Sequence, residues 1–527
     1  MIEIKGVKCD THNMLRDICL TKELRRLQDK TQMFNTRITE HFRTRLTHTI
    51  EVVMIAEEIT YRLNNILKEN NIQSIQPIDI NLVKSIAFAH DIGHTPYGHA
   101  GEEKINDLLR KKGLLFKHNI NTAKVLLDPK LITKSSNKEI FEFNFKTFDW
   151  RLFDGVIKHT SCLKSKETLA NLDDPYSLQK YFNNHPVLGN EDFINELNGI
   201  INTFDSNAFF IDQDCFKEKS FINNYINYKW SLSLEGQVVA IADEIAQRIS
   251  DLDDSIRLYH KISDENKKRE YANKLKELET KLLAFSKEFN NNAINPNLHK
   301  IINTISNSAE YIAKKISEFI ENEELINISQ YKISKNINRT LVSCLILNVE
   351  DRFKKSLLNT IVVDVDFTNN DEKCEYDIIL PVINDGIIFE FISFEKYTKE
   401  FVSILETYNK NIINDQIINN SNSIGKENIE KLFDIYKMDI KLVDTNTKRT
   451  LMFILKNQYA SYESLVKAYE NKSIDEITLN LIEQIILEGI ARMTDSYVEK
   501  SLNYYEGYRH YNYNSLKDIK LWDYDIF

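Results

Sequence analysis

The chain has 527 residues but only 13 glycines and 7 prolines, so residues that interrupt helices are rare and we predict a mostly α protein. Its net charge is −10 without a strongly basic tail, which excludes broad electrostatic attraction to nucleic acid. Its six cysteines have neither the C-x-x-C spacing of a zinc ribbon nor the pattern of a disulfide framework. Because we find no signal peptide and no apolar run of membrane-spanning length, we expect a cytoplasmic protein without a membrane partner.

The first informative helix pattern follows residues 43–48, which read R-T-R-L-T-H. Apolar residues then recur every three to four positions up to Ile59, which predicts a helix with Thr44 or Thr47 as its N-cap. His48 lies in the first turn of this helix. Taken alone, His48 would be a polar residue at a helix start and nothing more.

A second helix is predicted to begin near Asp79. His90 follows Ile86 by four positions, so it faces the core in the last turn, and Asp91 comes next. An adjacent His–Asp pair can offer a ring nitrogen and a carboxylate oxygen to one divalent ion. The simpler interpretation of such a pair is a buried, hydrogen-bonded histidine beside a turn.

Residues 89–102 read A-H-D-I-G-H-T-P-Y-G-H-A-G-E and contain three of the chain's 12 histidines. Three glycines and a proline in this stretch prevent a long regular helix. The histidines are His90, His94 and His99, and they share the stretch with two carboxylates, Asp91 and Glu102. Because imidazoles and carboxylates are so concentrated here, we expect the chemistry in this segment.

Two shorter segments add polar side chains. His118 and Asn119 precede an apolar run up to residue 127 that is typical of a helix, and Lys158 and His159 follow a short apolar segment. Either member of the second pair, taken alone, would be a surface lysine or a hydrogen-bonded histidine.

A long helix is predicted around residues 234–256. Its apolar stripe consists of Val238, Ile241, Ala242, Ile245, Ile249, Leu252 and Ile256. Asp243, Gln247 and Asp251 form a second line beside this stripe, and at 1.5 Å per residue that line spans ~12 Å. This length is comparable to the distance from a phosphate to the sugar of a nucleotide, although a solvated helix face would have the same spacing.

Four of these residues have the right atoms for one metal ion and come from three predicted helices: His48, His90, Asp91 and Asp243. Two imidazoles and two carboxylates suit Mn, Fe, Co, Ni, Zn or Mg, and they leave coordination positions open. The order H…HD…D is similar to that of the HD superfamily of metal-dependent phosphohydrolases.

Flanking motifs make the resemblance more specific. They are R-R-L-Q-D-K-T-Q-M-F (residues 25–34), R-T-R-L-T-H (43–48), the stretch 89–102, D-E-I-A-Q-R-x-x-D-L-D-D (243–254) and G-I-A-R-M-T-D-S-Y (489–497). Together they resemble the deoxyguanosine triphosphate triphosphohydrolase family over nearly the whole chain. The resemblance implies hydrolysis of a deoxynucleoside triphosphate (dNTP) at its α-phosphorus, which releases a deoxynucleoside and triphosphate, with dGTP expected as the preferred substrate.

The resemblance also implies roles for the residues of the site. The four candidate ligands would hold a divalent ion, with Mn or Mg expected first and Fe, Co, Ni or Zn as alternatives. His99 would lie near the attacked phosphorus with Glu102 orienting its ring, and His94 and His118 would line the same pocket.

Six further residues match substrate-binding positions of the family: Gln32 and Asp251 at the sugar 3′-hydroxyl, Arg45 and Lys158 at the phosphates, and Asn119 and Gln247 in the pocket. Gln247 stands where many members have tyrosine. Residues 116–118 (F-K-H) replace the Phe-Glu that often precedes the pocket asparagine. The preference for guanine is therefore implied by the family name and not by these residues.

The implied fold is an HD-domain helical core at residues 1–350 with a mostly helical region at 351–527 packed on it. The charged segment 261–289 within the core is expected to be a solvated helix or an arm between protomers. A turn signal in residues 382–389 (V-I-N-D-G-I-I-F) predicts a small β hairpin. The asparagine-rich stretches at 290–297 and 417–423 are predicted to be loops.

The family usually forms homo-oligomers, so we expect a tetramer or a hexamer, and single-stranded nucleic acid is kept as a candidate effector. Two other functions stay open. One is an HD-type phosphohydrolase or phosphodiesterase that acts on another nucleotide. The other is a non-catalytic nucleotide sensor or nucleic-acid-binding scaffold with the same fold, against which the intact set of candidate ligands argues.

Overall fold

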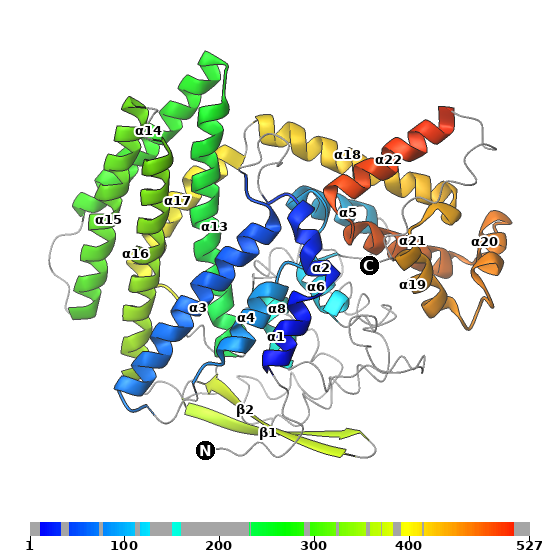
Figure 1. The fold of residues 1–527 in the computed structure, drawn as a ribbon, viewed down its shortest axis with the longest axis horizontal. Helices are drawn as coiled ribbons and strands as arrows, with labels where there is room; N and C mark the ends of the chain where they lie inside the picture. Colours follow the sequence, from blue (N-terminus) through cyan, green and yellow to red (C-terminus); the bar gives the residue numbers. More distant parts are fainter. Residues whose placement is uncertain are drawn as a thin grey trace.

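The computed structural model describes residues 11–32, 42–72, 77–110, 116–126, 150–159, 231, 233–288, 296–322, 326–354, 359–369, 372–382, 392–413 and 416–510. Within these ranges the chain is mostly helical, as the scarcity of glycine and proline predicted (Figure 1). No helix in the described part of the chain has both the length and the apolar character needed to cross a membrane. The helices up to residue 261 are α1 (Thr11–Cys19), α2 (Lys22–Arg26), the 3-10 helix η1 (Leu27–Asp29), α3 (Arg45–Glu69), α4 (Ile80–Ala89), α5 (Gly98–Arg110), α6 (His118–Leu126), α8 (Trp150–Lys158) and α13 (Leu234–Lys261).

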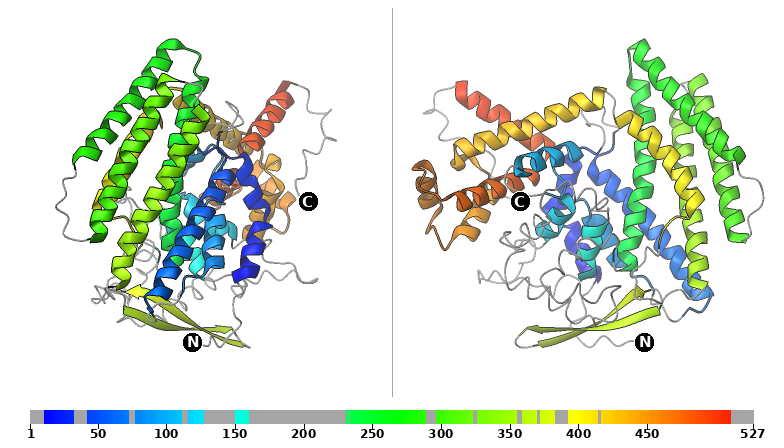
Figure 2. Two further views of the ribbon diagram at one scale, coloured as in Figure 1. Left: turned by 60° about the vertical axis from the view of Figure 1, so that its left-hand side comes forward. Right: turned by 180° about the vertical axis from the view of Figure 1, so that it is seen from behind.

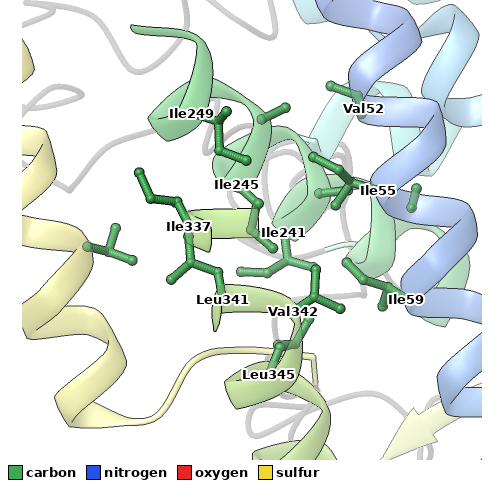
Figure 3. Packing of buried hydrophobic residues seen from close by; sticks show 14 of the residues in the cluster. Val52, Ile55, Ile59, Ile241, Ile245, Ile249, Ile337, Leu341, Val342 and Leu345 are labelled. Atoms are coloured by element: carbon green, nitrogen blue, oxygen red, sulfur yellow. The ribbon is translucent and has the colours of Figure 1, made fainter. Parts of the chain in front are cut away.

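The first hydrophobic core lies where α3, α13 and α16 (Ile326–Lys354) pack against one another (Figure 1). Apolar side chains recur on one face of α3 and α13 and are removed from water when these faces meet. Figure 3 shows this packing with Val52, Ile55 and Ile59 of α3, Ile241, Ile245 and Ile249 of α13, and Ile337, Leu341, Val342 and Leu345 of α16. Every residue of the predicted stripe from Val238 to Ile256 is buried, which confirms the predicted helix face.

The charged segment predicted at 261–289 forms a helix, α14 (Glu265–Glu288). It packs against α15 (Pro296–Glu321) and α17 (Lys396–Ile413). Its buried face consists of Tyr271, Leu275, Leu278, Leu282 and Phe285. Lysine–glutamate pairs four residues apart lie on the rest of its surface. The helix is therefore solvated on one side and part of the first core on the other.

A second hydrophobic core joins α5 to the C-terminal helices. These helices are α18 (Gln416–Met438), the 3-10 helix η5 (Ile440–Leu442), α19 (Thr445–Leu455), α20 (Tyr462–Glu470), α21 (Glu476–Ala491) and α22 (Asp495–His510). Figure 2 shows them on the side of the molecule opposite α14, α15 and α16. A boundary at residue 350 would place α5 with the N-terminal helices and α17 with the C-terminal ones. In the structure α17 belongs to the first core and α5 to the second. That boundary stays a prediction.

A β hairpin is present, but not at the predicted position. β1 (Asn359–Asn369) pairs antiparallel with β2 (Glu372–Val382), from Asn369 opposite Glu372 to Asn359 opposite Val382. The predicted turn signal therefore follows the second strand, and residues 383–389 lie outside the described part of the chain. In sequence, two residues, Asn370 and Asp371, separate the strands, and these types are also common in hairpin turns.

One of the two predicted loops is a helix. Residues 417–423 lie within α18, so this prediction was wrong. Asparagine has a low helix propensity, but Ile418 is buried in the first core, and tertiary packing of this kind overrides local propensity. Of the other asparagine-rich stretch, residues 290–295 lie outside the described part of the chain, and residues 296–297 begin α15.

We expect Ile245→Ala to lower the free energy of unfolding by about 2–5 kcal/mol, because it leaves a cavity in the fully buried contact between α13 and its neighbours. Met54→Ala on α3 is the control, since Met54 is 61% exposed and its loss should change stability by less than about 0.5 kcal/mol. Urea unfolding of both variants measures the difference. Equal destabilisation would contradict the assignment of the core.

Candidate functional site: a buried cluster of histidines and carboxylates

The start of α3 positions His48. Thr44 is the N-cap and accepts a hydrogen bond from the backbone N–H of Thr47, while the Thr47 hydroxyl accepts one from the backbone N–H of Thr44. The sequence predicted one or the other threonine as the cap, and the structure uses both. This reciprocal cap fixes the first turn, which carries His48.

Arg43 ties the start of α3 to α13. Its Nη1 donates to Asp253 Oδ2 at 2.6 Å and to Asp254 Oδ1 at 2.8 Å, and its Nε donates to Glu51 Oε1 at 2.8 Å. Hydrogen bonds between charged groups are stronger than neutral ones and fix geometry. Arg43 therefore sets the position of α3 along α13 next to the site.

The four predicted ligands converge from α3, the end of α4 and α13. His48 Nε2 lies 2.9 Å from Asp243 Oδ1, and these two residues are 195 positions apart. His90 Nε2 lies 3.8 Å from the same oxygen and 3.6 Å from Asp91 Oδ2. The structure therefore brings the four residues to one region, in two groups that share His90, and their binding of a single ion stays a prediction.

His90 has the hydrogen-bonding pattern of a metal ligand. Its Nδ1 lies 2.7 Å from the carbonyl oxygen of Ala87, which can only accept, so Nδ1 carries a hydrogen and, in the neutral ring, Nε2 keeps its lone pair. This Nε2 is buried and has no hydrogen-bond partner among the residues that the structure describes. Histidine ligands commonly donate the other ring N–H to a backbone carbonyl in this way. The donor set and the unpartnered nitrogen fit a divalent cation.

Both carboxylates are ionised, although Asp91 is buried and the Asp243 side chain is only 13% exposed. Burial alone would raise the pKa of Asp243, but the hydrogen bond from His48 and the neighbouring imidazole of His90 lower it to about 2. For Asp91, burial is outweighed by His90 and Arg45, which hold its pKa well below the ordinary value. Arg45 Nη1 donates to Asp91 Oδ2 at 2.8 Å. The site therefore offers anionic oxygen ligands at neutral pH.

His159, which the sequence analysis did not assign to the site, lies in the same cluster. It follows α8 directly and is buried, with its ring centroid 4.9 Å from that of His90. Its Nδ1 donates to the carbonyl oxygen of Val156 at 2.7 Å, so its Nε2 also keeps a lone pair. One nitrogen of its ring is within 4.8 Å of the ligand atoms of His90 and Asp91. Its place beside Lys158 after an apolar segment was the only sequence signal.

A second group of imidazoles lies beside the candidate metal ligands. The rings of His94 and His118 are stacked with centroids 4.1 Å apart, and the ring of His99 is 5.3 Å from that of His94. Glu102 Oε2 lies 2.8 Å from His118 Nδ1 but 4.0 Å from His99 Nδ1. The structure thus pairs Glu102 with His118, where the sequence predicted His99. His99 is the exposed member of the group, with 74% of its side-chain surface accessible.

The predicted substrate-binding residues differ in their surroundings. Four of them are buried, and Gln32 and Gln247 are partly buried; the buried ones are Arg45, Asn119, Lys158 and Asp251. Asn119 Nδ2 donates to the carbonyl oxygen of Ile157 at 2.9 Å, which holds the start of α6 to the end of α8. Burial raises the pKa of Asp251 to about 6. Contacts of these residues with a substrate stay predictions.

We expect Asp243→Ala to lose the bound divalent ion, because it removes an ionised oxygen ligand from the centre of the cluster. Glu244→Ala is the control, since Glu244 is the next residue of α13 and its side chain is 41% exposed. Metal content after reconstitution with Mn, measured by mass spectrometry, compares the two. Equal metal in Asp243→Ala and the parent would remove Asp243 from the ligand set.

His159→Ala is expected to weaken Mn binding about 10–100-fold, the usual effect of removing a group that supports a metal site. His299→Ala on α15 serves as the control because it lies outside the cluster. Calorimetric titration of the metal-free protein with Mn gives both affinities. An unchanged affinity in His159→Ala would show that His159 only packs against the site.

Comparisons with known proteins agree with this geometry. Residues 45–158 match the family model of the HD domain, a range that contains His48, His90 and Asp91 and ends just before His159. Asp243 comes from outside this range.

Several similar proteins carry the name deoxyguanosinetriphosphate triphosphohydrolase-like protein. One from Rickettsia rickettsii (strain Iowa) is 27% identical over 325 residues, which cover 61% of this chain and 64% of that protein. One from Rhodopseudomonas palustris (strain BisB5) is 32% identical over 234 residues, 44% of each chain. One from Pelagibacter ubique (strain HTCC1062) is 30% identical over 233 residues, 44% of this chain and 45% of that protein. The similarity thus spans less than two thirds of each relative. Residues 45–158 are thus similar to the HD domain, and the chain is similar to deoxyguanosinetriphosphate triphosphohydrolase-like proteins over part of its length.

Proposed function

We propose that the protein is a metal-dependent phosphohydrolase that converts dNTPs to deoxynucleoside and inorganic triphosphate, with dGTP as the expected preferred substrate. The main support is the convergence of two imidazoles and two ionised carboxylates around the unpartnered Nε2 of His90. The names of the relatives support the substrate class.

The metal ligands in this proposal are His48, His90, Asp91 and Asp243, with His159 next to them. Nitrogen and carboxylate donors suit Mn and Mg first, and Fe, Co, Ni or Zn as alternatives. When bound, a divalent ion neutralises charge on the phosphate oxygens and makes the phosphorus more electrophilic.

Positive side chains next to the cluster would hold the phosphates. Arg45 is fixed before any substrate arrives, since Nη1 bonds Asp91 and its backbone N–H donates to the carbonyl oxygen of Lys30 at 3.1 Å. Lys117 Nζ lies 3.7 Å from Glu102 Oε1, and Lys158 is buried at the end of α8. Cations that are already in place stabilise developing charge without the cost of reorganisation.

Hydrolysis requires that the attacking water lose a proton and that the 5′-oxygen of the departing deoxynucleoside gain one. His99 is the exposed imidazole of the second group, and its desolvated surroundings with the charges of Arg45 and His118 lower its pKa to about 4. Its ring is therefore neutral near pH 7 and can accept a proton. We therefore assign this proton transfer to His99. The Glu102–His118 pair would keep the neighbouring ring in one orientation.

Product analysis tests the proposed function. The four dNTPs and GTP, alone and in pairs, are incubated with the Mn- or Mg-loaded protein, and the phosphate products are separated by ion-exchange chromatography. Triphosphate together with deoxynucleoside supports the proposal. Pyrophosphate or monophosphate as the only product would indicate another phosphohydrolase, and tight dNTP binding without turnover would indicate a sensor.

We also propose a homo-oligomer, a tetramer or a hexamer, and this rests on the family resemblance alone. Light scattering of the purified protein gives the assembly mass, with and without dNTP or single-stranded nucleic acid. A monomer under all conditions would contradict it.

His99→Ala is expected to lower turnover of the preferred dNTP by roughly 10²–10⁴-fold, the usual effect of losing a general acid or base. Metal content and nucleotide binding should persist, because His99 is not among the four ligands. Steady-state kinetics, metal analysis and calorimetry measure the three quantities. Loss of the metal from this variant would mean that the role of His99 is misassigned.

A further inference from the structure

Asp495, the first residue of α22, contacts two segments that carry residues of the site. Its Oδ2 accepts hydrogen bonds from the backbone N–H and the hydroxyl of Thr31, at 3.0 and 2.5 Å. Its Oδ1 accepts the backbone N–H of Tyr97 at 2.8 Å. Thr31 precedes Gln32, and Tyr97 stands two residues before His99. One buried carboxylate of the C-terminal region thus links both segments.

The turn at Tyr97 depends on this region. Tyr97 and Gly98 both have φ of 58°, the left-handed region that a bulky residue rarely adopts. The tyrosine ring packs against Gly425 of α18, where an added Cβ would lie 2.7 Å from Cγ of the ring. Asn428 Nδ2 donates to the tyrosine hydroxyl at 3.2 Å. Such a conformation persists only where its surroundings hold it, and α18 and α22 do so here.

The turn is in direct contact with the other parts of the site. A Cβ on Gly98 would lie 3.1 Å from Nη2 of Arg45 and 3.3 Å from the carbonyl oxygen of Thr31. Thr31 also forms a β-bridge with Thr44, the cap of α3. A shift at Tyr97 would therefore displace Arg45 and the segment before Gln32 together with His99.

We propose that Asp495 is a positioning residue, which holds the turn before His99 and the segment before Gln32 in the geometry that turnover requires. The C-terminal region is then needed for the reaction and not only for stability. This inference rests on the proposed function, because His99 and Gln32 are assigned by it. Asp495 acts through Thr31 and Tyr97 and is not itself a catalytic residue.

The test is Asp495→Asn in the full-length, Mn-loaded protein. This substitution keeps the side-chain volume but replaces one acceptor oxygen with an NH₂ group, which cannot accept a hydrogen bond from Thr31 or Tyr97. We expect kcat for dGTP to fall at least about tenfold with unchanged Mn content, because misplacement by about 1 Å can cost far more than the loss of one bond. Hydrogen–deuterium exchange should accelerate at the amides of residues 27–32 and 94–102.

Asp444→Asn is the matched control. Asp444 also accepts three hydrogen bonds in the C-terminal region, from the backbone N–H groups of Asn446 and Thr447 at 2.9 and 3.2 Å and from the Thr447 hydroxyl at 2.5 Å. These bonds cap α19 and involve neither Thr31 nor Tyr97. We expect kcat within about twofold of the parent and an unchanged exchange pattern at residues 27–32 and 94–102.

Thr31→Val tests the interaction between Thr31 and Asp495 from the side of Thr31. It removes only the hydroxyl donor to Asp495, and we expect a smaller fall in kcat with faster exchange at 94–102. Combined with Asp495→Asn it should add little, because both act on one interaction. If Asp495→Asn does not fold, the result of Thr31→Val alone decides.

The proposal is overturned if the folded Asp495→Asn variant keeps the parent's kcat and exchange pattern, or if Asp444→Asn lowers kcat equally. If the parent hydrolyses no dNTP, the proposed function fails. The exchange pattern then still shows whether Asp495 holds the two segments.

Discussion

The site depends on the packing of α3 against α13. Two helices separated by well over a hundred residues share one apolar contact, and the polar edge of that contact brings His48 within 2.9 Å of Asp243. The hydrophobic contact is non-directional, so it cannot by itself set which turn of one helix faces which turn of the other. Arg43 supplies that direction, because its guanidinium bonds Asp253 and Asp254 about three turns further along α13 than Asp243. The packing of α3 against α13 in the first core therefore also sets the geometry of the candidate ligands.

Burial makes the electrostatics of the cluster interdependent. An isolated buried carboxylate is costly, and here each is stabilised by a neighbour that also belongs to the site. Asp243 bonds His48, and Asp91 bonds Arg45, so the groups that would bind a cation and the group that would bind a phosphate depend on one another. A cation that enters between His48 and Asp243 must replace their hydrogen bond. His48 and the two carboxylates thus have partners in the protein that a ligand can replace, whereas Nε2 of His90 has none among the described residues.

Much of this could be predicted from the sequence, because helical periodicity assigns a residue to a face and a turn. His48 in a first turn, His90 and Asp91 at a helix end, and Asp243 beside an apolar stripe all follow from that rule. The partner of Glu102 could not be predicted. Spacing along one helix favoured His99, whereas the contact with His118 arises because the fold brings the start of α6 to Glu102 of α5. His159 was missed for the same reason, since only the fold brings the end of α8 to the end of α4.

Predictions of secondary structure from local sequence were also wrong at two places. The asparagines of residues 417–423 favour a loop, yet the segment joins α18 because part of it contributes to a core. The hairpin turn was predicted in residues 382–389, after the second strand. That stretch and the pair Asn370–Asp371 both contain residue types that are common in turns. For α18 a contact with the first core determined the structure, whereas for the hairpin the pairing of the two neighbouring strands did.

His90 and His159 are oriented in the same way. In each, ring Nδ1 donates a hydrogen bond to the carbonyl oxygen three residues earlier, near the end of the preceding helix. An α-helix turns by about 100° per residue. Inserting or deleting a single residue near the end of α4 or α8 would therefore swing the imidazole away from the cluster, even if every contact of the helix body were kept. Related chains can vary the composition of these two helices, but the number of residues between their packed faces and the terminal histidines has to stay constant.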